Sequence, residues 1–268
     1  MRNIRKQLCK WLTIMALVLS GSSGFPCCAH ADDISDKALN LLRKSLEFVG
    51  QQDTLLMDFD SDIEVVTPEI EKVQFTSSGK MLLERPGNLY IARTGGYSDI
   101  ELYLGEKTLT VFGKNLNVYA QTTVPADMNQ VIDKIRNELG LDLPGADLFL
   151  ANAYEDLVAD VIDAKLIGEG VINGVECHHL TFRNADTDWQ VWIEKSASPF
   201  PRKYVITSKN MAAAPQYTLT IKNWQTDVQP AEDVFIFKPP PNAKQVDIKG
   251  LAELDEVPPA AAKERGSS

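Results

Sequence analysis

The chain has 268 residues, with 27 basic and 37 acidic side chains and a formal net charge of -10 at pH 7. Hydrophobic residues at 44% and charged residues at 24% are ordinary values for a globular protein, which excludes the collagenous and the disordered classes. No apolar run reaches the roughly 18 residues of a membrane-spanning helix, which excludes an integral membrane protein of the helical kind.

The first 31 residues have the pattern of a secretory signal peptide. Basic residues open the chain, an apolar stretch from Trp11 to Leu19 follows, and Ala29-His30-Ala31 is a small-x-small cleavage site. A lipoprotein signal is the alternative, because Cys27 and Cys28 lie nearby. Gly24-Phe25-Pro26 is a poor match to the aliphatic-small-small triplet of such a signal, so we expect cleavage after Ala31 and soluble export to the periplasm of a Gram-negative envelope.

Removal of the signal makes the chain more acidic. The segment holds four bases and no acids, so the mature chain has 23 bases against 37 acids and a formal charge of about -14. Such a surface repels phosphate backbones and anionic lipid head groups, so we expect no nucleic-acid partner and no electrostatic docking on membranes. Cys177 is the one cysteine left, so no internal disulfide can form, and we expect its thiol to be buried.

Residue periodicity predicts short strands with helices at the beginning and in the middle. A helical stripe covers residues 34–49, and Asp127 with Gln130 forms a capping box that begins a second helix up to Gly140. A third, short helix is predicted after Asn152. Short β-forming runs, most of them alternating apolar and polar residues, predict strands at residues 54–65, 73–76, 80–84, 88–93, 100–104, 108–112, 166–172, 175–183, 189–194, 203–208, 217–224 and 234–237.

These elements predict one mainly β (α+β) domain. A single curved antiparallel sheet would be covered on its concave side by the inserted helices. We place this domain at residues 32–249, after the signal peptide at 1–31. The remaining residues, 250–268, are rich in alanine and proline without an apolar face and are expected to be disordered.

Several motifs resemble the outer-membrane lipoprotein carrier (LolA/LolB-like) superfamily. They are Leu83-Glu84-Arg85-Pro86-Gly87-Asn88-Leu89-Tyr90, the strands between Leu102 and Tyr119, Trp224 with its strand, and Phe235-Ile236-Phe237-Lys238-Pro239-Pro240. Within it the chain is most similar to a group of predicted periplasmic proteins without assigned function, through residues 137–144, 174–180 and 188–194. The resemblance implies a half-open antiparallel β-barrel with an N-terminal helix and an inserted helical lid.

The resemblance also gives Arg85 a role. In the carriers, the arginine of the Arg-Pro motif holds the backbone of the lid, and a guanidinium with five donors can bind several carbonyls at once. An ordinary surface salt bridge is the other interpretation of Arg85. The chain departs from the carriers in its longer helical insertion and in the segment around His178 and His179.

Strand parity selects the side chains that should point into the barrel. If the lid covers them incompletely, they leave a pocket for an acyl chain; if they pack fully, the core is filled. We predict the ligand-binding residues to be Phe59, Ile63, Leu83, Ile91, Leu102, Leu104, Val111, Trp189, Val191, Ile193, Ile206 and Leu219. We predict the lid residues to be Arg85, Met128, Ile132, Ile135 and Leu139.

Other chemistry finds less support. Cys177 and His179 share one strand face while His178 points to the other, so a metal site would need ligands from elsewhere. The alternating carboxylates from Asp58 to Glu64 are better explained as a solvated outer face than as a calcium site, because a straight strand cannot wrap one ion. No nucleophile elbow, phosphate loop or dinucleotide motif is present, so we predict no cofactor, no metal and no enzymatic activity.

The sequence therefore favours noncovalent carriage of an apolar ligand in the periplasm, either a lipid or the acyl chain of a lipoprotein. The alternative is an envelope protein-interaction or stress-sensing module with a protein partner and no small ligand. A hydrolase is a third, weaker hypothesis.

Overall fold

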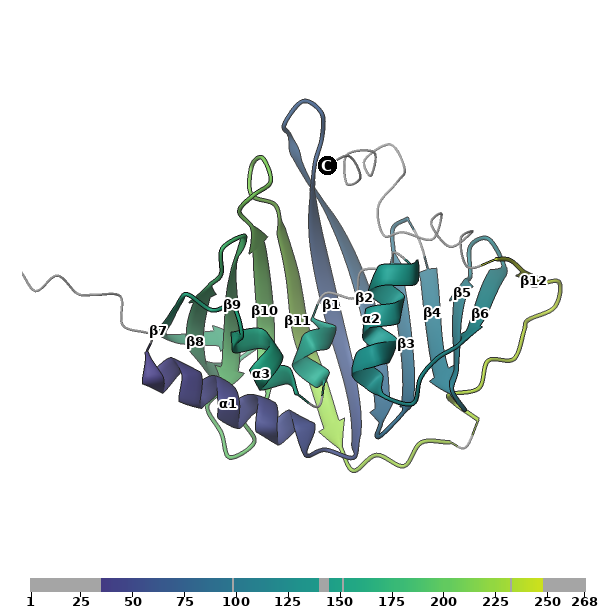
Figure 1. Cartoon of the computed structure of the whole chain (residues 1–268), viewed down its shortest axis with the longest axis horizontal. Coiled ribbons are helices and arrows are strands. Elements are labelled where there is room, and N and C mark those ends of the chain that lie inside the picture. The colour runs from purple at the N-terminus through teal and green to yellow at the C-terminus, as the bar shows by residue number, and fades with distance from the viewer. Residues whose placement is uncertain (1–34, 98, 140–144, 151, 232, 248–268) are drawn as a thin grey trace, which may run out of the picture. The chain divides into compact units, whose positions relative to one another are not determined.

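The computed structural model describes residues 35–97, 99–139, 145–150, 152–231 and 233–247 (Figure 1). The signal peptide, both predicted domain boundaries and the tail at 250–268 lie outside these residues. The elements in chain order are α1 (Asp36–Gly50), β1 (Thr54–Val66), β2 (Lys72–Glu84), β3 (Asn88–Gly95), β4 (Asp99–Gly105), β5 (Thr108–Gly113), β6 (Val118–Thr123), α2 (Met128–Leu139), the 3-10 helix η1 (Ala146–Phe149), α3 (Ala153–Val158), β7 (Asp163–Ile172), β8 (Val175–Arg183), β9 (Thr187–Glu194), β10 (Pro201–Ser208), β11 (Gln216–Thr226) and β12 (Lys244–Gln245).

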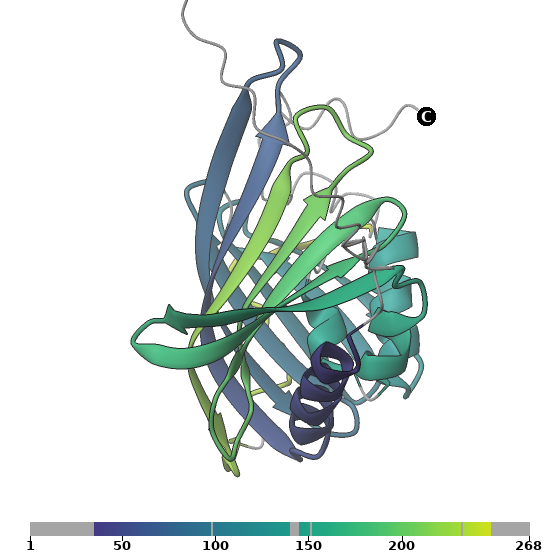
Figure 2. The same cartoon turned by 90° about the vertical axis from the view of Figure 1, so that its left-hand side faces the viewer.

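The strands form one twelve-stranded sheet in the order β12-β6-β5-β4-β3-β2-β1-β11-β10-β9-β8-β7. All neighbours are antiparallel except β12, which pairs with β6 in parallel. The order begins at β12 and ends at β7, so the sheet does not close on itself. The helices lie on one side of this curved sheet (Figure 2). The predicted mainly β, half-open fold with an N-terminal helix and an inserted helical lid is therefore confirmed.

The two faces of the sheet are distinguished most clearly on β1, where side chains alternate. Its odd-numbered residues belong to the concave face, and its carboxylates are on the convex face. There Asp60 accepts hydrogen bonds from Lys222 (2.7 Å) and Ser78 (2.5 Å), and Glu64 is paired with Lys72 at 2.9 Å. These carboxylates form the solvated outer face that their spacing predicts, with partners on the neighbouring strands.

Local signals in the sequence set the beginnings of the helices. The Ser35 hydroxyl caps α1 by accepting from the Ala38 amide at 3.3 Å, so the helix begins slightly later than its apolar stripe predicts. The Asp127 carboxylate accepts from the Gln130 amide at 3.0 Å, which is the interaction that the capping box predicts. Asn152 precedes α3, although its side chain makes no capping hydrogen bond.

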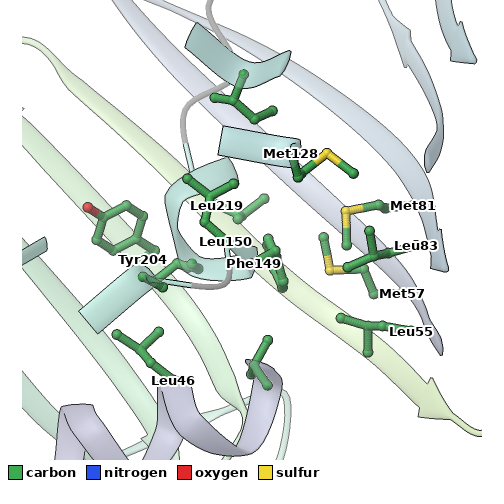
Figure 3. Close-up of a cluster of buried hydrophobic side chains, with 14 of the residues drawn as sticks. Leu46, Leu55, Met57, Met81, Leu83, Met128, Phe149, Leu150, Tyr204 and Leu219 are labelled. Atoms are coloured by element: carbon green, nitrogen blue, oxygen red, sulfur yellow. The ribbon is translucent and has the colours of Figure 1, made fainter. Parts of the chain in front are cut away.

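The hydrophobic core lies between the concave face and the helices. Leu148, Phe149 and Leu150, in and after η1, are buried in the same cluster as the inward side chains of the strands. Figure 3 shows Met128 of α2 pointing toward Met81 and Met57, which are cross-strand partners on β2 and β1. The helices thus complete a core that the open sheet could not close alone.

The predicted strand at residues 234–237 is wrong. This segment forms a turn at residues 234–235 and a bend at Ile236 and is not a strand. Its Phe237 lies on the convex face, because Tyr103 and Phe112 have the parity opposite to that of the buried Leu102 and Val111. Phe237 packs among Tyr103, Phe112 and Tyr119, with ring centroids 5.0 to 5.4 Å apart. These aromatic contacts account for the apolar character of Phe237, and the prolines that follow cannot donate ladder hydrogen bonds.

Gly79 on β2 gives a test of how closely the concave face is packed. A Cβ at this position would meet the ring of Phe59 and would lie 2.8 Å from the backbone oxygen of Ala92. We therefore expect Gly79→Ala to lower the free energy of unfolding by about 2 kcal/mol, a typical cost of overpacking. Urea unfolding measures the change. Gly96→Ala is the control, because a Cβ there meets nothing within 4 Å, and equal stability of the two variants would contradict the prediction.

Candidate ligand-binding site

The predicted ligand-binding residues divide into two groups. One group is buried in the core: Phe59, Leu83, Leu102, Leu104, Val111, Trp189, Val191, Ile193 and Leu219. The other group is half-buried and consists of Ile63, Ile91 and Ile206. Strand parity thus identifies the concave face, but in this closed arrangement most of the predicted residues pack against one another and against the helices.

Four of the five predicted lid residues lie on α2, and those whose side chains are described cover this core; the fifth, Arg85, follows β2. Met128 is 9% exposed, Ile132 3% and Ile135 0%. Leu139 is the last residue of α2, and its side chain lies outside the described part of the chain. Because Met128 meets Met57 and Met81 across the core (Figure 3), the contact between α2 and the sheet includes flexible, unbranched side chains that can repack.

Arg85 joins two segments of backbone. Its Nη2 donates to the carbonyl of Phe149 in η1 at 2.9 Å, and its Nε donates to the carbonyl of Gln52 after α1 at 3.1 Å. The amide of Arg85 also donates to the carbonyl of Asp53 at 2.8 Å. The side chain therefore binds the inserted helical segment, although at η1 rather than at α2, and ties it to the end of the N-terminal helix.

A row of half-buried apolar and aromatic side chains crosses the concave face. Phe75 on β2 is opposite Ile63 on β1, Ile63 is opposite Tyr217 on β11, and Tyr217 is opposite Ile206 on β10. We call these four residues the open strip. The side chain of each is partly exposed to solvent, whereas most other side chains on the concave face are buried. The open strip includes two of the three half-buried predicted residues, Ile63 and Ile206.

A cavity of about 310 Å³ adjoins the open strip. It lies where the β2–β3 ladder ends at the pair Ser77 and Gly95. The residues that line it are Phe75, Ser77, Arg93, Gly95, Gly96 and Tyr97, together with Gln74 and Thr76. Phe75 belongs to both the cavity and the open strip. This volume is at the low end of the range for small-molecule sites.

Polar groups lie at and behind one side of the cavity wall, where Ser77 and Arg93 line it. The Ser61 and Ser77 hydroxyls are hydrogen-bonded at 2.7 Å, and the phenol of Tyr217 is hydrogen-bonded to Ser61. Arg93 is near enough for its charge to act on the phenol of Tyr217. Apolar, hydroxyl and cationic groups therefore meet at this end of the concave face.

The phenol of Tyr217 gives the site a measurable pH dependence. Burial raises the pKa of Tyr217 to about 12, while the Ser61 hydrogen bond and the charge of Arg93 act in the opposite direction. An unfolded tyrosine titrates near pH 10, so this contribution to stability is complete below about pH 10 and is lost as the pH rises toward 12. We expect unfolding free energies over this range to fall by about 2 kcal/mol more in the wild type than in Tyr217→Phe. Equal pH dependence of the two proteins in urea unfolding would contradict this assignment.

The segment from Cys177 to His179 is divided between the two faces as strand geometry predicts. His179 stacks on Trp192 with centroids 4.1 Å apart and is hydrogen-bonded to Gln190 at 2.9 Å. Cys177 is fully buried, but it lies on the convex face of the sheet, away from the main core. Burial raises the pKa of its thiol. His178 lies on the concave face, opposite Ile193, and its pKa is lowered by burial and by the charge of Lys195.

Sequence reasoning missed the residues that line the cavity, Phe75 and Arg93 among them, and Tyr217 of the open strip. Tyr217 alternates with the predicted Leu219, so its parity was available from the sequence. Arg93 has the same parity as the predicted Ile91, and the Gly95-Gly96 pair beyond it marks the turn at which the cavity forms. The signal that could have located the cavity was a basic residue at an inward-facing strand position close to a turn that contains glycine.

Comparison with known proteins identifies the family. The family model for "Predicted periplasmic protein (DUF2092)" matches residues 38–249. The chain belongs to the DUF2092 family. The predicted similarity to a group of periplasmic proteins without assigned function is thereby confirmed. We found no curated protein that matches the chain.

Solved structures with a similar fold come from several bacteria. Lipoprotein LppX of Mycobacterium tuberculosis has a TM-score of 0.47 and 14% identity, covering 73% of this chain and 99% of that one. LprF of Mycobacterium bovis has a TM-score of 0.44 and 13% identity, covering 73% and 96%. The MucA/MucB complex of Pseudomonas aeruginosa has a TM-score of 0.43 and 14% identity, covering 75% of this chain and 61% of that one.

In the described part of this DUF2092 protein, no helix has the length and apolar character needed to cross a membrane.

Proposed function

We propose that this DUF2092 protein binds an acyl chain, from a lipid or a lipoprotein, noncovalently on the concave face of its sheet. The observation that carries the proposal is the open strip, which is apolar, partly exposed and continuous with the 310 Å³ cavity through Phe75. The proposed activity is the binding and transport of the ligand and involves no catalysis. Export through the N-terminal signal would place this activity in the periplasm.

The dimensions of the open strip suit an acyl chain. Its four residues span three steps between neighbouring strands, which at about 4.8 Å per step is roughly 14 Å. Each methylene moved from water onto such a surface contributes about 0.8 kcal/mol, so five methylenes contribute on the order of 4 kcal/mol. A free energy of this size lowers the Kd about 1,000-fold, which is enough to retain a ligand.

The inserted helices give the site a second state. The nine buried predicted residues become available if α2 and η1 move away from the sheet, and the contact of Met128 with Met57 and Met81 can repack around a guest chain. Arg85 opposes this movement, because it holds the Phe149 carbonyl against the end of α1. The nine buried predicted residues thus belong to the opened site, whereas the open strip is already accessible in the closed one.

Native mass spectrometry of protein purified from the periplasm tests the proposal. We expect a fraction of the protein to carry a mass increment that lipid extraction removes and that fragments as an acyl-containing molecule. Repeated recovery of bare protein, together with crosslinking that captures a protein partner and no lipid, would instead support the protein-interaction module.

A further inference from the structure

We propose that the cavity at the end of the β2–β3 ladder receives the anionic head group of the bound amphiphile, with Arg93 as its cationic partner. This inference rests on the proposed function, because it names the class of ligand for the same site. It assigns the apolar chain to the open strip and a carboxylate or phosphate group to the cavity.

The charge distribution of the cavity points to an anion. Among the described residues that line it, Arg93 is charged and the others are neutral, although the whole chain has a net charge of -10. An acidic protein does not attract anions by its overall field, so a cation at a cavity wall gives local selectivity. Arg93 also has contacts within the protein, and its five donors leave capacity for ligand oxygens.

The hydroxyl groups beside Arg93 extend the polar region. Ser77 lines the cavity, its Oγ is 2.7 Å from that of Ser61, and Ser61 is hydrogen-bonded to Tyr217. Ser77 is the hydroxyl residue of this group that lines the cavity, with Ser61 and Tyr217 behind it. A hydroxyl or guanidinium donor at the cavity wall can bind an ionised oxygen, and such charge-assisted hydrogen bonds are the strong ones.

The positions of the cavity and the open strip fix the orientation of the ligand. Phe75 is the residue that they share, so an amphiphile with its head group beside Arg93 and Ser77 would extend its chain past Phe75 toward Ile63. Gly96 and Tyr97 border the cavity on the side of the β3–β4 turn, and Tyr97 is 40% exposed there. The turn side is thus the accessible side of the head-group site.

A head-group series on the wild-type mature protein tests the proposal without any variant. The probes are hexadecanoate, hexadecyl phosphate, hexadecan-1-ol and hexadecyltrimethylammonium, each at a concentration at which it is monomeric, with acetate and inorganic phosphate as free anions. We expect both anionic amphiphiles to bind about 10- to 100-fold more tightly than the alcohol, as charge-assisted hydrogen bonds predict. Equal affinity for the alcohol would overturn the head-group assignment and leave the proposed function intact. Binding of none of the four amphiphiles would overturn both, as would binding of inorganic phosphate without any amphiphile.

Variants then test the residue. Arg93→Gln is expected to remove the preference for anions while leaving the affinity for the alcohol within about twofold, and Arg93→Lys should restore most of the preference. Arg183→Gln is the matched control, because Arg183 is an exposed arginine paired with Asp188 on the β8–β9 hairpin. A loss of affinity for the alcohol equal to that for hexadecanoate, in an Arg93→Gln protein that melts like the wild type, would overturn the role of Arg93.

Discussion

Replacing Arg85 with leucine is expected to lower the free energy of unfolding by about 3 kcal/mol and to loosen η1 from the end of α1. The variant loses the donors to the carbonyls of Phe149 and Gln52, and each hydrogen bond from a charged group contributes about 1.5 to 3 kcal/mol. We expect hydrogen exchange at the Leu148 amide, which donates to the Gly145 carbonyl at 3.2 Å, to accelerate more than exchange in the strands. A bound acyl chain should also dissociate faster.

The control for this experiment is Arg183→Leu, which removes an arginine from the exposed surface and should change stability by less than about 1 kcal/mol. If Arg85→Leu leaves exchange in residues 146–149 and ligand dissociation unchanged, Arg85 is an ordinary structural residue and has no part in holding the inserted helices.

Replacing Ile63 with lysine is expected to weaken binding of an acyl ligand by at least about 100-fold while the protein stays folded. Ile63 is at the centre of the open strip, between Phe75 and Tyr217. A lysine there removes an apolar contact and obliges the ligand to desolvate an ammonium group, which together cost about 3 kcal/mol or more. Displacement of a fluorescent fatty acid measures the change in affinity.

Thr218→Lys is the matched control for Ile63→Lys. Thr218 is next to Tyr217 on β11 but has the opposite parity, and it is paired with Asp62 of the convex face. The same added charge on that face should leave affinity unchanged. Similar losses in the two variants would show that binding does not depend on the open strip.

The sequence predicts the faces and ends of the elements better than it predicts the site. Alternation on β1 distinguishes the row from Asp58 to Glu64 from the inward residues, because the two-residue period of a strand is visible in one segment. The capping box at Asp127 is equally local. The segment at residues 234–237 is a short apolar run of β-forming residues, but it is apolar for another reason, since Phe237 fits among aromatic rings from three strands, which no local pattern records.

The location of the cavity depends on information that is absent from any single segment. Parity shows that Leu102 and Val191 point inward, but not that they are covered while Ile63 and Ile206 stay partly exposed. That difference arises from where η1 and α2 lie over the sheet and from the ladder of β2 and β3 ending at Ser77 and Gly95. Both are long-range features of packing and register.

Photocrosslinking with a fatty acid that carries a diazirine near its methyl end tests the central claim most directly. After irradiation and digestion, we expect the label on the concave residues of β1, β10 and β11, at or next to Ile63, Ile206 and Tyr217, and we expect excess unlabelled fatty acid to suppress it. Label that is concentrated on the convex face, or that excess fatty acid does not reduce, would contradict acyl-chain binding on the open strip.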